Sequence, residues 1–199
     1  MKLYYSVTSP FARKIRIAAM ILDLDAEVEL VNTDVYAKND YFRINPLQKI
    51  PSLTTREGQT LTNSPFILEY LDFISLGKKI LPLAGPERWP ALNFQSIADG
   101  IMEASVLRRY ESLRPADRQD MSFENRQKEK ITNGLSFFET NHFQMTKNWG
   151  VAEISLACAL GYLDLRFSKE NWLKVYPHLS HWYQSVKESD VMKKTEAKI

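Results

Sequence analysis

A change of pattern near the middle of the chain limits what this sequence can fold into. Glycine and proline crowd between Gly77 and Pro90, and such residues interrupt both helices and strands. Before this stretch, short strand-like and helix-like segments alternate, whereas after it we find helical periodicity alone. With 199 residues and 44% apolar side chains, the chain can bury a core in each half. We therefore expect a first domain at 1–77, a linker at 78–90 and a second domain at 91–199.

The first half is typical of a small mixed sheet with helices on its faces. Short β-prone runs bounded by turn residues predict four strands, at 2–6, 27–31, 52–55 and 59–62. Apolar residues at helical spacing predict helices at 10–22 and 65–74, and a short polar helix is expected at 40–44. The resulting order is βαβαββα, an α/β arrangement.

The second half predicts an all-helical domain. Helical periodicity covers 92–110, 122–141, 151–167 and 177–187. From Ile154 to Leu163 the third of these helices is apolar almost all round, so we expect it at the buried centre. Cys158 lies in this helix and is expected to be inert core.

Composition excludes several classes of protein. The net charge is +2 with acids and bases interspersed, which gives no basic field for nucleic acid. A single cysteine permits no internal disulfide framework and favours a reducing compartment. No signal peptide is visible, and the longest apolar run is shorter than the ~20 residues of a membrane span. We expect a cytoplasmic protein without membrane contact, and no metal, because His178 and His181 lack a partner ligand at a suitable spacing.

Three local features of the first half place polar groups where they suit an anion or a peptide backbone. Ser9 stands just before a proline at a predicted helix start, at the positive end of the helix dipole. Pro51 precedes a predicted strand, and a cis bond there would leave the backbone of Ile50 free to pair. At the other helix start, Ser64 follows Asn63, and we expect Ser64 to cap the helix.

Taken together, these motifs resemble the glutathione S-transferase family, in its bacterial type with serine at the catalytic position. The motifs are S-P-F at the first helix, N-P-x-x-K-I-P-x-L before the third strand, and N-S-P-x-I-x-E-Y-L at the next helix. The resemblance extends over essentially the whole chain, including the proline-rich linker and the run from Tyr176 to Trp182. It implies a thioredoxin-like N-terminal domain followed by an all-helical C-terminal domain.

The resemblance also implies a function and a set of site residues. The chain would be a glutathione transferase acting in detoxification, with glutathione as co-substrate, no prosthetic group and a homodimeric assembly. Ser9 would hold the glutathione sulfur as thiolate, and the second substrate would be a small hydrophobic electrophile lying between the domains. The glutathione-binding residues would be Ser9, Phe11, Lys49 (or Lys38), Ile50, Asn63 and Ser64, with Pro51 as the structural cis-proline.

Several alternatives stay open at this point. Ser9 could be a helix cap alone, in which case Thr8 or Tyr5 could contact the sulfur. The basic residues Arg13, Lys14 and Arg16 either raise the local potential for an anion or form a solvated helix face. Trp89, Phe94 and Tyr110 either line the electrophile site or seal the domain junction.

Two departures from the family pattern bear on function and stability. The family usually has Glu or Gln where this chain has Asn63, which weakens the case for tight γ-glutamyl binding and favours a non-catalytic binding scaffold as an alternative. A glutathione-dependent reductase or peroxidase is the other alternative. The buried C-terminal helix begins with Gly150 in place of a hydroxyl residue, although Glu153 can still reach back to the helix start.

Overall fold

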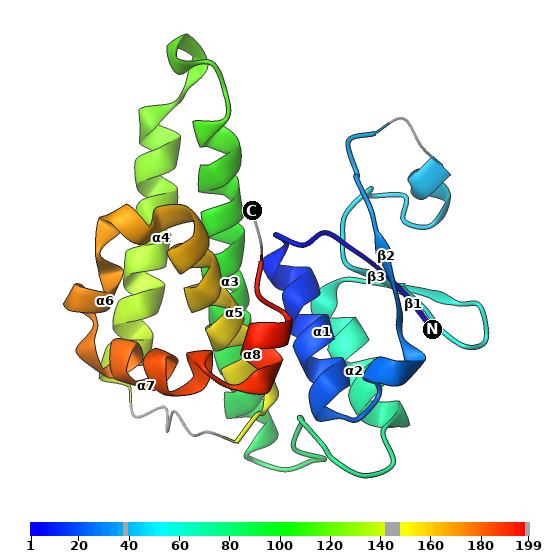
Figure 1. Ribbon diagram of the computed structural model, residues 1–199. Helices are drawn as coiled ribbons and strands as arrows, with labels where there is room; N and C mark the ends of the chain where they lie inside the picture. The colour runs from blue at the N-terminus through cyan, green and yellow to red at the C-terminus, as the bar shows by residue number, and fades with distance from the viewer. Residues whose placement is uncertain (38–39, 142–147, 198–199) are drawn as a thin grey trace.

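The computed structural model describes residues 1–37, 40–141 and 148–197, and it confirms the predicted fold class. A small sheet with two helices forms the N-terminal part, and the rest of the chain is helical (Figure 1). Helix α1 stands between the sheet and the helical part in this view. The two parts share one continuous set of buried apolar residues.

The sheet is mixed and has four strands in the order β2-β1-β3-β4. They are β1 (Lys2–Tyr5), β2 (Glu29–Asn32), β3 (Ser52–Thr54) and β4 (Thr60–Thr62). β1 pairs parallel to β2 and antiparallel to β3, and β3 pairs antiparallel to β4. Leu3 and Leu53 face each other across the central pair and are fully buried. The burial of these two leucines fixes the register, because a shift by one residue would turn a leucine to the other face of the sheet.

The N-terminal helices are α1 (Pro10–Ile21) and α2 (Ser64–Ile74), with a short 3-10 helix at Asp25–Glu27. The short polar helix expected at 40–44 is present as a 3-10 helix at Asp40–Arg43. In this 3-10 helix Tyr41 alone is buried, and Asn45, which precedes a proline, is biased away from helical geometry. An amphipathic face sufficient for a longer helix is missing here.

Helix α3 (Arg88–Ser112) begins inside the segment predicted as a linker. Pro90 stands in its first turn, where a backbone N–H would have no partner within the helix. Between α2 and α3 the chain is anchored by the buried carboxylate of Asp72, which accepts backbone N–H bonds from Ile80 at 2.6 Å and Leu81 at 3.1 Å. The domain boundaries themselves stay a prediction.

The helical part is built around α5 (Val151–Phe167), which is buried without interruption from Ile154 to Leu163 as predicted. Around it lie α3, α4 (Met121–Thr140), α6 (Trp172–Val175), α7 (Pro177–Lys187) and α8 (Asp190–Lys194), with 3-10 helices at Ala116–Arg118 and Ser168–Glu170. The Gly150 backbone N–H donates to the Glu153 carboxylate at 3.1 Å, so the reaching-back half of the capping box is present. No described helix is both long and apolar enough to cross a membrane.

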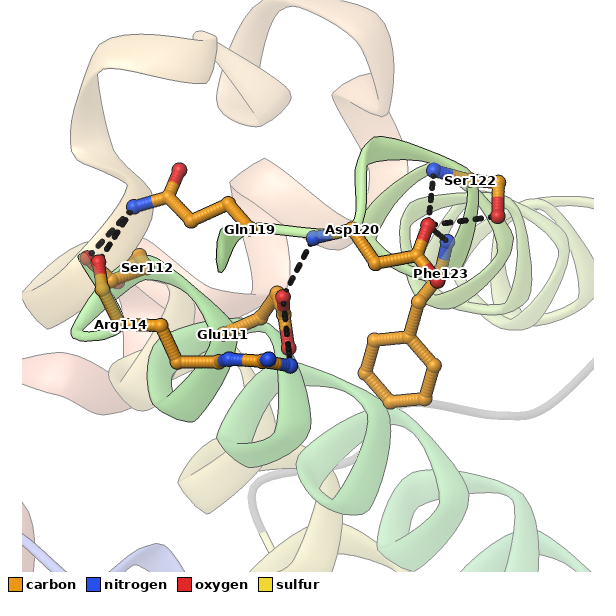
Figure 2. A network of polar contacts seen from close by, with 7 residues as sticks. All are labelled: Glu111, Ser112, Arg114, Gln119, Asp120, Ser122 and Phe123. Carbon is orange, nitrogen blue, oxygen red and sulfur yellow. Dashed lines mark hydrogen bonds and ion pairs between the residues drawn. The ribbon is translucent and has the colours of Figure 1, made fainter. Parts of the chain in front are cut away.

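A polar network closes the turn between α3 and α4 (Figure 2). The Asp120 carboxylate caps α4 by accepting from the backbone N–H groups of Ser122 at 2.9 Å and Phe123 at 3.1 Å. The Glu111 carboxylate accepts from the Asp120 N–H at 2.6 Å and is also paired with Arg114. This cap starts α4 at Met121, one residue before the predicted start.

The two arginines of α1 donate hydrogen bonds to the C-terminal segment of the chain, a role that the sequence did not predict. Arg13 and Lys14 are buried, and Arg13 donates to the Met192 carbonyl at 2.9 Å and to the Thr195 hydroxyl at 3.2 Å. Arg16 donates to the carbonyls of Thr195 at 3.2 Å and Lys194 at 3.1 Å. The solvated face is therefore wrong for Arg13 and Lys14, because neighbouring helices cover these side chains. A raised local potential for an anion stays a prediction, and Arg13 lines the same cavity as Ser9. The arginines satisfy carbonyl groups at the end of α8.

Candidate functional site

The strand register gathers the predicted site residues at one end of the sheet. Tyr4 near the end of β1 lies opposite Ser52 at the start of β3, and Ser52 lies opposite Thr62 at the end of β4. Three segments therefore lie at the same end of the sheet: the loop that leads to Ser9, the loop that holds Ile50, and the start of α2. Three segments far apart in the sequence thus form one surface.

Ser9 is the N-cap of α1. Its Oγ accepts a hydrogen bond from the Ala12 backbone N–H at 3.2 Å, and its own N–H donates to the Ser6 carbonyl at 3.2 Å. A hydroxyl has one proton to donate beside the lone pairs that accept. The cap bond uses a lone pair and leaves the proton available, so capping does not compete with donation to an anion.

The peptide bond between Ile50 and Pro51 is cis. The loop before it is held by two side chains that converge on the Lys49 carbonyl, with the Tyr41 hydroxyl at 2.9 Å and the Asn45 amide nitrogen at 2.7 Å. The Asn45 amide also donates to the Ser52 hydroxyl, which lies 2.9 Å from the Tyr41 hydroxyl. This bracing fixes the backbone on either side of Ile50.

Sequence reasoning missed the bracing role of Tyr41 and Asn45. Asn45 offered a signal, because an Asn-Pro dipeptide favours a side-chain turn, and its Oδ1 accepts from the Leu47 N–H at 3.0 Å. Tyr41 offered none, since its partners lie across the loop. Burial raises the pKa of the Tyr41 hydroxyl, which keeps it a neutral donor.

The start of α2 differs from prediction by one residue. Asn63 is the N-cap and Ser64 is the first helical residue, so the prediction that Ser64 caps this helix is wrong. Asn63 has φ 72°, which is uncommon for a residue with a side chain, and asparagine is among the residues that tolerate positive φ best. This conformation leaves the Asn63 amide exposed and without a cap bond. Such local strain is typical of functional positions.

Ser64 is connected to the centre of the molecule through Lys14. The Lys14 ammonium lies 3.4 Å from the Ser64 hydroxyl and 2.5 Å from the Asp99 carboxylate of α3. Burial lowers the pKa of Lys14 and raises that of Asp99, while their mutual attraction opposes both shifts. The ion pair therefore joins α1 to α3, and the contact of Lys14 with Ser64 connects the start of α2 to this pair.

A cavity of about 480 Å³ adjoins Ser9. Its lining combines the loop before α1, which contributes Thr8 and Ser9, with Tyr162 of α5 and with Lys187 and Glu196 from the C-terminal part. At its base lies Cys158, which is fully buried, and burial raises the pKa of its thiol to about 11. The inert thiol agrees with the prediction for this residue.

The remaining site candidates take different places. Tyr4 and Tyr5 point to opposite faces of β1, with Tyr4 beside Tyr41 and Tyr5 under the guanidinium of Arg16. Phe11 is half-buried against the core and Lys49 is exposed. The alternative Lys38 lies outside the described residues.

The three aromatic residues considered for the domain junction have separate roles. Phe94 packs against Phe137 and Phe138 with ring centroids 5.8 Å away, so it belongs to the helical core. Trp89 is exposed. Tyr110 alone of the three faces the other domain, with its ring centroid 6.5 Å from that of Tyr36.

Within 1–37, 40–141 and 148–197, no three His, Cys, Asp or Glu side chains are grouped so that they could hold a metal ion.

Comparison with known proteins assigns the chain to a family. The models of the glutathione S-transferase N-terminal and C-terminal domains match residues 8–73 and 123–185. A GST-like protein of Escherichia coli K12, YibF, which has no characterised function, is 34% identical and covers 98% of each chain.

Solved structures of a glutathione transferase family member from Pseudomonas fluorescens Pf-5 are similar along the whole chain. With bound glutathione, that protein superposes with a TM-score of 0.95 at 33% identity, covering 100% of this chain and 99% of that one. With bound S-(propanoic acid)-glutathione the TM-score is 0.92, again at 33% identity, covering 100% of both chains. By fold and by sequence, the chain belongs to the glutathione S-transferase family.

Proposed function

We propose that this protein binds glutathione and transfers it to a small hydrophobic electrophile, with Ser9 stabilising the thiolate. The observation that carries the proposal is the Ser9 hydroxyl at the start of α1, where it caps the helix and keeps a proton to donate. The relatives from Pseudomonas fluorescens bind glutathione and a glutathione conjugate, which supports the same ligand here.

A hydrogen bond from Ser9 and the N-terminus of α1 can together supply the free energy that thiolate formation needs. A free thiol has a pKa of about 8.5, and lowering it by ~2 units needs roughly 2.7 kcal/mol of preferential thiolate stabilisation. A hydrogen bond to a charged group supplies about 1.5–3 kcal/mol, and a helix N-terminus adds roughly 0.3–1 kcal/mol. Ser9 and α1 together are therefore sufficient without a metal or a general base.

The rest of the tripeptide would be held by groups around Ser9. In this proposal the cysteinyl backbone pairs with Ile50, the γ-glutamyl end binds Ser64 and the exposed amide of Asn63, and Lys49 meets the glycine carboxylate. The bound thiolate then attacks an electrophile held beside it, and the reaction gains from proximity and orientation.

Substitutions of Ser9 separate its two roles. Ser9→Ala removes both the cap and the donor, whereas Ser9→Asp keeps a good cap acceptor but places a negative charge where the thiolate would lie. We expect both variants to raise the pKa of bound glutathione by roughly 1–2 units, and Ser9→Asp to retain the thermal stability that Ser9→Ala loses. The measurements are thiolate absorbance against pH, aryl halide conjugation and thermal unfolding.

Thr8→Val and Tyr5→Phe are the matched controls, since each removes one of the alternative hydroxyls. We expect both to keep the thiol pKa of the wild type. Loss of activity in Tyr5→Phe together with an unchanged Ser9→Ala would assign the role to Tyr5 and contradict our assignment.

The alternative functions make different predictions. A scaffold for protein partners need not bind glutathione, so calorimetry with glutathione alone distinguishes it from a transferase. A peroxidase would act faster on hydroperoxides than on aryl halides. A reductase working through a protein thiol is disfavoured, because the one cysteine of the chain is fully buried.

We also propose a homodimer. The outer face of α2 exposes Phe66 and Phe73, and Trp89 at the start of α3 is exposed as well. Large apolar side chains gathered at a surface favour burial by a partner. Light scattering tests the assembly, and Phe73→Glu is expected to shift the protein toward monomer. A wild type that is monomeric at all concentrations would contradict the proposal.

A further inference from the structure

A group of aromatic and cationic side chains beside the Ser9 cavity has no part in binding glutathione as proposed above. Tyr36 comes from the loop after β2, Arg109 and Tyr110 from the last turns of α3, and Tyr162 and Arg166 from one face of α5. Three segments from both halves of the chain therefore contribute to one surface.

The aromatic part of this group spans the two domains. The rings of Tyr36 and Tyr110 meet edge to face with centroids 6.5 Å apart. Exposed fractions of 76% for Tyr36 and 49% for Tyr110 leave ring surface available to a ligand. Aromatic faces and edges of this kind pack favourably against another aromatic ring.

The cationic part stands out by comparison with the neighbouring Arg108. Arg108 is buried and ion-paired with Glu124 at 3.1 Å and Glu170 at 2.6 Å. Arg109 and Arg166, which we call the arginine pair, form no ion pair with any carboxylate in the described part of the chain. Arg109 reaches the Ser112 hydroxyl at 3.4 Å, and the Nε of Arg166 is buried without a hydrogen-bond partner.

Tyr162 connects the arginine pair to the reaction site. The Arg166 guanidinium lies 5.9 Å from the centroid of the Tyr162 ring, and Arg166 and Arg109 both act on this side chain electrostatically. Tyr162 in turn lines the same cavity as Thr8 and Ser9. A molecule held at the arginine pair would thus extend toward the sulfur position at Ser9.

We propose that the electrophile of this enzyme is an aromatic compound carrying a carboxylate, with its ring against Tyr36 and Tyr110 and its carboxylate on Arg109 and Arg166. Guanidinium groups match carboxylates in geometry and charge, and among the described residues no carboxylate pairs with either of these two cations. The inference rests on the proposed transferase function and names the substrate class of that site.

A chlorodinitrobenzoate is a suitable probe, because its reaction leaves the carboxylate untouched. The glutathione thiolate attacks the carbon that bears chlorine, the carbon–sulfur bond forms, and the carbon–chlorine bond breaks with chloride leaving as the anion. The methyl ester of the same compound reacts in the same way but is neutral. Comparing acid and ester therefore isolates recognition of the charge.

The test measures kcat/KM for both probes in wild type and in Arg109→Gln/Arg166→Gln, with Arg126→Gln as an exposed control arginine on α4. We expect the double variant to lose about tenfold or more in kcat/KM for the acid and less than about twofold for the ester. Titration with the product of glutathione and the carboxylate probe should show the same loss of affinity in the double variant. Glutathione affinity and the control variant should be unchanged.

Two outcomes overturn the inference, and they are distinguishable. If the wild type fails to bind glutathione in the same calorimeter, the proposed function fails and the inference with it. If glutathione binds normally but acid and ester are affected equally by the double substitution, the substrate class alone is wrong.

Discussion

Helix α3 is held in two different ways along its length. At its middle, Asp99 forms a single buried ion pair with Lys14 of α1, and this pair links the two halves of the protein. Near its C-terminal end, Arg108 pairs with two carboxylates, and Glu111 joins the network that closes the turn to α4 (Figure 2). At the middle of α3 one ion pair joins the helix to α1, whereas near its C-terminal end Arg108 and Glu111 each have more than one polar partner.

The pKa directions at the two places show the physical consequence. For Lys14, burial outweighs the attraction of its one carboxylate, and its pKa is lowered. For Arg108, burial also lowers the pKa, but hydrogen bonds and charges from Glu170 and Glu124 outweigh it, and the pKa is raised. A buried cation with one counter-charge stays costly, whereas two counter-charges make the charged form the favoured one. We infer that the domain junction next to the candidate site is the more sensitive region.

The largest effect is expected from Asp99→Asn, which leaves the Lys14 charge buried without its carboxylate. Loss of one partner of a buried pair costs about 3 kcal/mol, which should appear as a lower midpoint in urea unfolding. Asp117→Asn, in an exposed 3-10 helix, is the control and should leave the midpoint unchanged. Equal stability of the two variants would contradict the sensitivity assigned to this junction.

The double variant Lys14→Met/Asp99→Leu sharpens the comparison. Replacing both charges by apolar groups removes the desolvation cost together with the attraction, so its unfolding free energy should return to within about 1 kcal/mol of the wild type. The same urea measurement applies. A double variant as unstable as Asp99→Asn would mean that shape at this position, and not charge, limits stability.

A smaller effect is expected at the other region from Glu170→Gln, since Arg108 keeps Glu124. Although burial raises the pKa of Glu170, its hydrogen bond and ion pair with Arg108 lower it further, to a net value below the usual one. Its stabilisation is therefore present above the unfolded-state pKa and is lost as the pH falls through the folded-state pKa. We expect a loss of about 1 kcal/mol or less at neutral pH, after allowance for solvent screening, which vanishes in acid. A difference that persists in acid would argue against a charge effect.

The smallest effect is expected from Asp120→Ala at the start of α4. The pKa of Asp120 is lowered by the Ser122 hydroxyl and by the Phe123 backbone N–H, so the cap favours the charged form. Loss of this exposed cap should lower the thermal midpoint slightly, with the difference fading as the pH falls through the pKa of Asp120. Asp120→Ser retains a cap acceptor, so its thermal midpoint should lie between those of Asp120→Ala and the wild type.

Much of the fold was predictable because its signals are local. Alternation and turn residues gave the strands, and continuous apolar sequence identified α5 as the buried helix, which the structure confirms. The position of Ser9 before a proline predicted the start of α1. Its role with sulfur, like the roles of Ile50, Asn63 and Lys49, stays a prediction that rests on the family resemblance.

Other features depended on contacts between distant segments. No local sequence pattern predicts that Tyr41 contacts the Lys49 carbonyl. The same is true of the edge-to-face contact between Tyr36 and Tyr110. The same holds for the covering of Arg13 by α8, 179 residues later in the chain.

The sequence by itself determined which segments become helices and strands, where α1 and α5 begin, and which family the chain resembles, because these depend on neighbours a few residues apart. Tertiary structure alone decided which charges are buried. Lys14 and Arg109 are both basic helical residues in the sequence, yet Lys14 is enclosed with Asp99, whereas Arg109 has no carboxylate partner within 1–37, 40–141 and 148–197. The physical reason is that the cost of a charge depends on the solvent and counter-charges around it, and these are set only when the domains pack together.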